Sequence, residues 1–185
     1  SNLEKSNMKQ TIMLGFSDGT KDGGYLSANW AIFQAKKRLS NLAKKYSIDV
    51  TFFDGRGGPP SRGGGNTNEF YQSLAQEIGA HDIQLTIQGQ TISANYGTLS
   101  SATYNFEQLL SAGLSGRLFN HRDLLIDEHQ EQIIQQLSDS SLETYLELRD
   151  NPLFIDYLEE ITPLDYLTKA NIGSRPAKRS KDSKL

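Results

Sequence analysis

Residues 49–66 read DVTFFDGRGGPPSRGGGN, and this stretch decides how the rest of the chain is interpreted. Residues 49–53 combine β-branched and aromatic side chains, which is typical of a strand. The loop that follows carries Arg56 and Arg62 among glycines. Glycine lets the backbone approach a ligand closely, and arginine presents a planar fork of donors that matches carboxylate and phosphate oxygens. The loop is therefore expected to bind an anion.

On either side of this stretch the apolar pattern alternates between strand and helix. Strands are expected at residues 11–16, 49–53 and 83–87, and helices at residues 25–46 and 67–78. The first helix is expected to bury the apolar side chains that recur at helical steps and to expose the lysines between them; the apolar set is Leu26, Trp30, Phe33, Leu39, Leu42 and Tyr46. This order predicts a parallel α/β sheet with functional loops at the carboxyl ends of its strands.

From about residue 100 the pattern becomes helical. Helices are expected at residues 104–114, 124–137, 141–149 and 154–161, with Pro152 and Pro163 as breaks. The expected domains are a cloning scar or linker at 1–10, βα units at 11–98, a helical region at 99–168 and a truncated basic loop or tail at 169–185. Three strands cannot close a barrel, so the sheet is either small and open or incomplete in this chain.

Composition excludes several classes of protein. The 185 residues carry a net charge of -3, which argues against a general nucleic-acid binder. Cysteine is absent, so disulfides and thiolate metal sites are excluded. The sequence has no membrane-spanning run and no signal-peptide pattern, and we therefore expect a cytoplasmic protein with no membrane partner.

A second polar loop, GFSDGTKDGG at residues 15–24, follows the first expected strand. Asp18 supplies a carboxylate of the kind that Mg²⁺ prefers, and Lys21 can hold an anion beside it. The alternative is that Asp18 only shapes a turn. For Asp22 we keep the structural interpretation, in which it caps the next helix.

The glycine loop also has alternative interpretations. A flexible surface loop is one, and an RNA-binding segment is another, because Arg-Gly-Gly occurs twice. RNA-binding segments of this type are long and repetitive, whereas this loop is single and contains Pro59-Pro60. A stand-alone anion- or RNA-binding module remains the alternative to an enzyme.

Four colinear segments together resemble phosphoenolpyruvate carboxylase over most of the chain. They are LGFSDGTKDGGYLSANW, FDGRGGPPSRGGGNT, QLTIQGQTIS, and FIDYLEEITPLDYL with NIGSRPAKR. The departures are Asp54 in place of the usual histidine, Gly19 and Gly23 in place of small residues, Asn66 in place of proline and Gln90 in place of glutamate. None of them adds or removes a matched arginine, lysine or metal ligand.

The resemblance implies several βα units of a (β/α)8-type barrel, incomplete in this chain, followed by a mainly helical region. It implies an enzyme that converts phosphoenolpyruvate and bicarbonate to oxaloacetate and phosphate with Mg²⁺ or Mn²⁺. By position, Asp18 would be a metal ligand and Lys21 a bicarbonate contact, while Arg56 and Arg62 would grip phosphate or carboxyphosphate. The implied substrate-binding residues also include Gly57, Gly63 and Gln88.

The resemblance also implies that parts of the active site lie elsewhere. The catalytic histidine segment and a second metal carboxylate precede this region in the family, so the isolated chain is expected to be inactive. Its partners would be the rest of the parent chain and other subunits of a homo-oligomer, a tetramer in the family. His81, His121 and His129 match no catalytic position and are expected to be surface or structural residues. Arg175 and Arg179 belong to a basic segment that is either solvated or faces a ligand.

Overall fold

The structure is a computed structural model that describes residues 8–59, 63–74, 78, 82, 84–87, 89–118, 126–163 and 166. Its centre is a three-stranded parallel sheet in the order β1-β2-β3, formed by β1 (Lys9–Leu14), β2 (Asp49–Gly57) and β3 (Gln84–Ile87). The predicted parallel α/β architecture is confirmed. Closure into a barrel stays a prediction, because the described strands form an open sheet.

The register of the sheet changes near the end of β2. Asp54 lies opposite Leu85 and Gly57 lies opposite Ile87, so β2 advances by three residues where β3 advances by two. One extra residue in β2 is the mark of a bulge, which can re-aim a side chain. The prediction ended this strand at residue 53 and was wrong, because pairing with β3 holds the backbone extended as far as Gly57.

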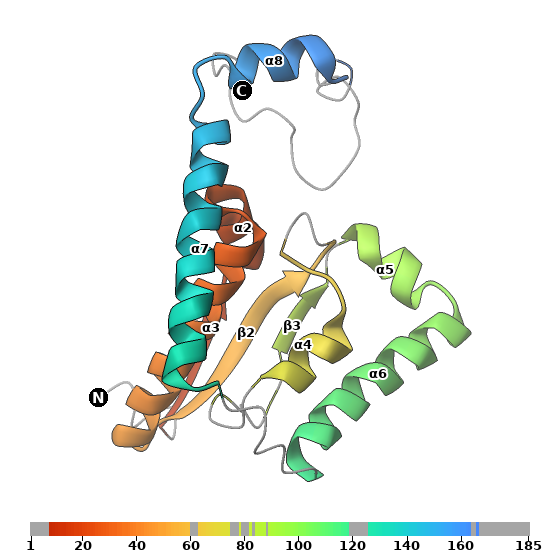
Figure 1. The fold of residues 1–185 in the computed structure, drawn as a ribbon. Helices are drawn as coiled ribbons and strands as arrows, with labels where there is room; N and C mark the ends of the chain where they lie inside the picture. The colour runs from red at the N-terminus through yellow and green to blue at the C-terminus, as the bar shows by residue number, and fades with distance from the viewer. Residues whose placement is uncertain are drawn as a thin grey trace. The chain divides into compact units, whose positions relative to one another are not determined.

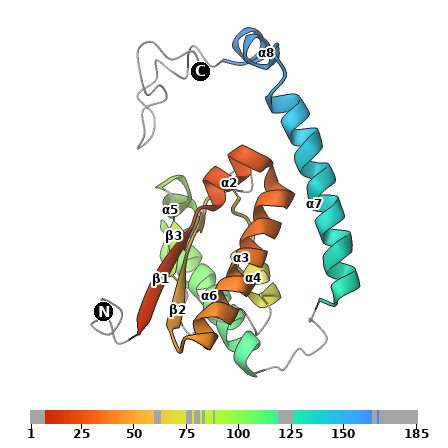
Figure 2. The ribbon, with the colours of Figure 1, turned by 90° about the vertical axis from the view of Figure 1, so that its left-hand side faces the viewer.

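Two helices lie to the same side of the strands (Figure 2). They are α3 (Tyr25–Lys45), which connects β1 to β2, and α4 (Thr67–Ser73), which follows β2. Burial alternates along β2, so Phe52, Asp54 and Arg56 share the face that these helices cover. Placing consecutive crossover helices on one face of a parallel sheet is the usual consequence of right-handed connections.

The buried side of α3 differs from the predicted apolar stripe. Leu26, Leu42 and Tyr46 are exposed, and Lys36 is fully buried although the lysines were expected to face solvent. The buried residues of the helix are Ser27, Ala28, Trp30, Lys36, Ser40 and Ala43. The physical reason is tertiary: β2 presents a carboxylate to this helix, and a buried carboxylate requires a partner.

A helix, α2 (Phe16–Gly23), stands where a turn was predicted. Phe16 is fully buried and anchors its start, and the Thr20 hydroxyl donates to the Phe16 carbonyl at 2.8 Å. Gly24, at φ 79°, ends α2 and is the N-cap of α3, which no side chain caps. The expectation that Asp22 caps α3 was therefore wrong.

The remaining described elements are helical (Figure 1). They are α5 (Gly89–Tyr96), which was not predicted, α6 (Leu99–Leu118), α7 (Glu128–Arg149) and α8 (Phe154–Ile161), the last with the predicted bounds. Asp127 and Gln130 bond reciprocally, side chain to backbone, which fixes where α7 begins. The predicted break near residue 138 was wrong, since serine and aspartate weaken a helix somewhat less than glycine and far less than proline.

By its contacts the chain divides into one unit up to Leu142 and a second from Glu143. In the first unit, Trp30 Nε1 of α3 donates to Gln135 Oε1 of α7 at 2.8 Å. In the second, the described part contains the end of α7 and α8. None of the helices in the described residues is long and apolar enough to cross a membrane.

Candidate anion-binding site

Arg56 lies beside the bulge at the carboxyl end of β2 and is 4% exposed. Its guanidinium carbon is 4.0 Å from the ring centroid of Phe70, and Nη2 donates to the Asn66 carbonyl at 3.3 Å. Nε and Nη1 are buried and have no hydrogen-bond partner in the described part of the chain. A buried donor without a partner costs about 1–3 kcal/mol, so these two nitrogens mark a position where an anion would be stabilised.

Asn66, whose carbonyl accepts the hydrogen bond from Arg56, also caps the next helix. Its side chain accepts hydrogen bonds from the backbone of Asn68 and Glu69, which makes it the N-cap of α4. Phe70 follows one turn later and forms an edge-to-face contact with Phe16 at 5.6 Å. The cap and this aromatic contact together hold the ring against which Arg56 rests.

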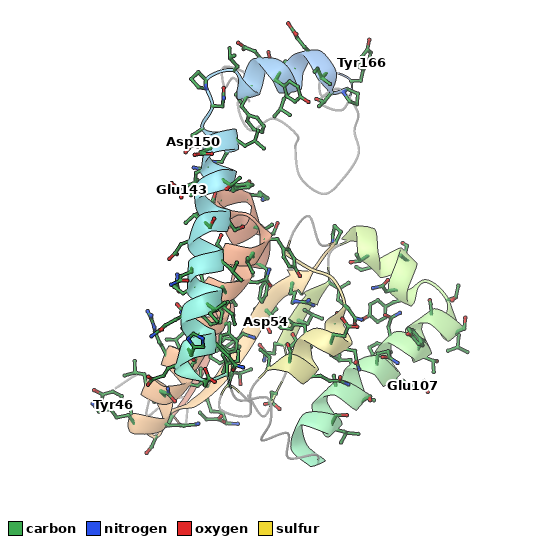
Figure 3. The ribbon with its side chains drawn as sticks, viewed as in Figure 1. Tyr46, Asp54, Glu107, Glu143, Asp150 and Tyr166 are labelled. Carbon is green, nitrogen blue, oxygen red and sulfur yellow. The ribbon has the colours of Figure 1, made fainter. Side chains whose placement is uncertain are left out.

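Asp54, labelled in Figure 3, lies two residues before Arg56. It is the centre of a buried polar cluster. Lys36 Nζ approaches its Oδ2 to 2.7 Å, and the Tyr71 hydroxyl donates to the same oxygen at 3.0 Å. The other carboxylate oxygen, Oδ1, is buried and has no partner among the described residues. Lys36, Asp54 and Tyr71 are called the Asp54 cluster below.

Burial dominates the electrostatics of the site. Burial lowers the pKa of Lys36. The negative charge of Asp54 opposes this shift, and the positive charge of Arg56 adds to it. Burial also lowers the pKa of Arg56, although arginine stays charged in proteins, and it raises the pKa of Tyr71, with Asp54 acting in the same direction. With Lys36 protonated, this buried region contains two cations, Lys36 and Arg56, and one carboxylate, Asp54. The excess of positive charge favours binding of an anion next to Arg56.

Three glycines around the site have no room for a side chain. A Cβ on Gly57 would stand 1.7 Å from the Thr86 carbonyl oxygen, and one on Gly64 would stand 1.6 Å from that of Gly58. Gly63 has φ 73°, and a Cβ there would stand 2.6 Å from Thr20 Oγ1. The glycine loop therefore packs closely on β3 at its start and on α2 at its end, which brings the two loops predicted from the sequence together.

Asp18 and Lys21 lie on α2 and form an exposed ion pair at 3.1 Å. The prediction that they share one ligand site stays a prediction. No group of three or more metal-binding side chains occurs among the described residues. Since Mg²⁺ can be held by one or two carboxylates with water and substrate, Asp18 fits the part of one ligand, but the described residues do not offer a full set.

The structure places Asp18, Lys21, Arg56, Gly57 and Gly63 around adjoining ends of β2 and α2. Arg62 and Gln88 lie outside the described residues, as do His81, His121, Arg175 and Arg179. His129 is exposed on α7, which confirms the expectation of a surface histidine.

The sequence interpretation missed the residues that surround Arg56, namely Lys36, Phe70 and Tyr71. It noted Asp54 only as a departure from histidine. One signal was available: with Phe52 buried in a strand, the period of two places Asp54 and Arg56 on the same inner face. A buried carboxylate then demands a cation, although the sequence does not say which lysine provides it.

Comparison with known proteins gives one consistent result. The family model described as phosphoenolpyruvate carboxylase matches residues 1–185. The chain is similar to proteins named phosphoenolpyruvate carboxylase from two species. It is 39% identical to the protein from Corynebacterium glutamicum over 99% of the chain, and 41% identical to the protein from Corynebacterium efficiens over 96%. A third, from Corynebacterium diphtheriae, is 38% identical over 95% of the chain. The chain spans about a fifth of the length of these relatives, at 20%, 19% and 20% respectively.

Proposed function

The chain belongs to the phosphoenolpyruvate carboxylase family, and we propose that it supplies the phosphate-gripping part of an enzyme that makes oxaloacetate and phosphate from phosphoenolpyruvate and bicarbonate. The observation that carries the proposal is the arrangement at Arg56. Its guanidinium is buried beside a bulge, rests on Phe70 and keeps two donors without partners among the described residues. A group of this kind suits an oxyanion whose charge grows during a reaction.

The proposed chemistry makes charge control the main task of the protein. Bicarbonate attacks the phosphoryl group of phosphoenolpyruvate, which gives carboxyphosphate and the enolate of pyruvate. Carboxyphosphate then breaks down to CO₂ and phosphate, and the enolate carbon captures the CO₂ to form oxaloacetate. Arg56 and Arg62 hold the phosphoryl oxygens, and Lys21 contacts bicarbonate. Gly57, Gly63 and Gln88 line the substrate position. Fixed cations next to the reacting anions offset their mutual repulsion and orient them for attack.

A divalent cation, Mg²⁺ or Mn²⁺, completes the proposal. Asp18 would provide one carboxylate ligand from its exposed position on α2, and further ligands would come from outside this chain. When bound, such an ion neutralises negative charge on the phosphate and the enolate. Lys21 is within hydrogen-bond distance of Asp18, so its ammonium would stand next to the same anions.

We further propose that β1, β2 and β3 are part of a (β/α)8-type barrel whose other strands lie outside this chain. Both edges of the described sheet, β1 and β3, are open to further pairing. The working enzyme would be a homo-oligomer in the cytoplasm. The isolated chain would not carboxylate, because a site that has lost several members loses nearly all of its activity.

The test is to assay the chain within a full-length carboxylase and to measure oxaloacetate and phosphate together. Equal amounts of the two products, dependent on bicarbonate and on Mg²⁺ or Mn²⁺, are expected. Consumption of phosphoenolpyruvate without carboxylation would contradict the proposal. Replacing Arg62 with lysine keeps the charge but loses the planar fork, so kcat should fall by about 10²–10³-fold while the protein stays folded.

A further inference from the structure

We propose that Lys36 and Tyr71 are positioning residues that occupy the carboxylate of Asp54 and so keep it from pairing with Arg56. This inference rests on the proposed function, since it takes Arg56 to be the group that receives the anion. It adds a role for a buried cluster that the proposed chemistry does not use. The ligand concerned is an oxyanion such as phosphate, and the competing group is a carboxylate of the protein itself.

The positions of Asp54 and Arg56 on β2 favour an ion pair between their side chains. Asp54 and Arg56 lie two positions apart on one face of a strand, where a side chain can reach its neighbour, and both are buried. An arginine and a carboxylate in such surroundings form the strongest common ion pair, frequently with two hydrogen bonds. A pair of that kind would use the donors that a substrate anion needs.

The structure shows a different pairing. Within the described residues no ion pair within 4.0 Å joins Asp54 to Arg56. Two donors from the described residues, Lys36 Nζ at 2.7 Å and the Tyr71 hydroxyl at 3.0 Å, converge on Oδ2 of the carboxylate. Each comes from a different helix, α3 and α4, so the carboxylate is held from two sides.

Arg56 is held apart by its own contacts. Phe70 supports the guanidinium carbon at 4.0 Å, and the Asn66 carbonyl accepts from Nη2. The same Phe70 ring centroid lies 5.4 Å from Lys36 Nζ, so one aromatic side chain is in cation–π contact with both cations, which offsets part of the cost of burying them. This arrangement leaves Nε and Nη1 for a ligand.

The experiment measures the dissociation constant of inorganic phosphate by calorimetry in the full-length carboxylase that carries this chain. The variants are Lys36→Gln, Asp54→Asn and the double variant with both changes. Lys36→Gln should weaken phosphate binding by about tenfold or more, because the unpaired carboxylate turns to Arg56. The double variant should recover affinity to within about threefold of the parent, since asparagine carries no charge to compete.

Asp54→Asn alone should bind phosphate at least as tightly as the parent. If Lys36→Gln does not fold, Tyr71→Phe with and without Asp54→Asn repeats the test, because it removes one donor and keeps the ring. Near-ultraviolet circular dichroism establishes that each variant compared is folded. The melting temperatures of the single and double variants are also compared. If the double variant recovers phosphate affinity without melting at a higher temperature than the single variant, misfolding did not cause the loss.

Two results overturn the inference: phosphate affinity in Lys36→Gln equal to that of the parent, or a double variant as weak as the single one. Arg56→Gln separates this failure from failure of the proposed function. If Arg56→Gln leaves phosphate binding unchanged, Arg56 is not the anion site and the proposed function fails at its central residue. If binding depends on Arg56 but not on Lys36, the positioning role alone is wrong.

Discussion

Two lysine–aspartate pairs in this chain share similar nitrogen–oxygen distances and have opposite surroundings. Lys36 and Asp54 are 2.7 Å apart with side chains that are each 2% exposed, whereas Lys21 and Asp18 are 3.1 Å apart with side chains 53% and 78% exposed. Water and salt screen the second pair, which limits its contribution to about 1 kcal/mol. The first pair has lost its hydration and depends on its partners for compensation.

The difference separates two ways of building a charged site. On α2, Asp18 and Lys21 remain accessible, so a metal ion or bicarbonate can reach them without displacing the protein core. On β2, the Asp54 cluster stands behind Arg56 where solvent does not reach, and it sets the charge around that arginine. The exposed pair is accessible to solvent, and the buried cluster, whose Asp54 lies two residues before Arg56 on β2, is shielded from solvent.

The largest expected effect comes from breaking the buried pair on one side. Lys36→Met should lower the free energy of unfolding by about 3–5 kcal/mol, because it leaves the Asp54 carboxylate buried without its cation. Urea unfolding followed by circular dichroism measures the change. The matched control is Lys21→Met, for which the loss should not exceed about 1 kcal/mol. Equal losses in the two variants would show that burial does not distinguish the pairs.

Removing the second donor to Asp54 should have a smaller effect. Tyr71→Phe keeps the ring but removes a hydrogen bond to a charged acceptor, and we expect a loss of about 1.5–3 kcal/mol at pH 7. Tyr104→Phe, at an exposed position on α6, is the control and should change stability by less than about 0.5 kcal/mol. A Tyr71→Phe variant as stable as the parent would show that the Tyr71 hydroxyl does not contribute to the free energy of unfolding.

The same residue predicts a pH dependence. Because the pKa of Tyr71 is raised in the folded chain, the native state keeps this proton above pH 10 while the unfolded chain releases it. The contribution of Tyr71 is thus fully present below pH 10 and is lost as the pH rises further. The stability difference between the parent and Tyr71→Phe should shrink above pH 10. Lys36 titrates in the opposite sense, but it is present in both proteins and its effect largely cancels in the difference.

Glycines of the two regions should also respond differently to alanine. Gly57→Ala puts a methyl group 1.7 Å from a carbonyl oxygen of β3 and should destabilise the chain by about 1–3 kcal/mol. Gly19→Ala on α2 meets only the Ala28 methyl at 3.4 Å and gains helix propensity, so it should be neutral or stabilising by up to about 1 kcal/mol. Thermal unfolding compares them. A tolerated Gly57→Ala would mean that β2 and β3 can separate at the bulge.

The sheet could be predicted because its strands follow local rules. Residues 83–87 alternate and residues 11–16 form a short apolar run, patterns that do not depend on distant contacts. The helix α2 could not be predicted, since its glycines and aspartates favour turns when considered locally. Its first residue, Phe16, is fully buried, and this tertiary burial, which stabilises α2, becomes visible only in the folded chain.

The candidate site shows the same division. Arg56 could be identified from its glycine neighbours, but its position at the end of a strand depends on pairing with β3. Lys36 could not be identified, because a lysine on an amphipathic helix normally faces water and 18 residues separate it from Asp54. Sequence patterns therefore named Arg56 as a candidate ligand-binding residue, which stays a prediction, while its buried neighbours Lys36 and Tyr71 became visible only through the packing of α3 and α4 on β2.

The smallest expected change in stability provides the sharpest test of the exposed pair. Lys21→Met should alter the free energy of unfolding by no more than about 1 kcal/mol, and 1 M salt should remove most of that difference. Lys9→Met is the matched control, since Lys9 forms another exposed pair with Asp49 at 3.9 Å, at the start of β1 and β2 rather than at their carboxyl ends. If Lys21 contacts bicarbonate, carboxylation by the full-length protein should fall in Lys21→Met and should not fall in Lys9→Met. A contact that is equally strong in the ground state and in the transition state would raise KM for bicarbonate and leave kcat unchanged. Unchanged KM and kcat in Lys21→Met would show that Lys21 does not contact bicarbonate.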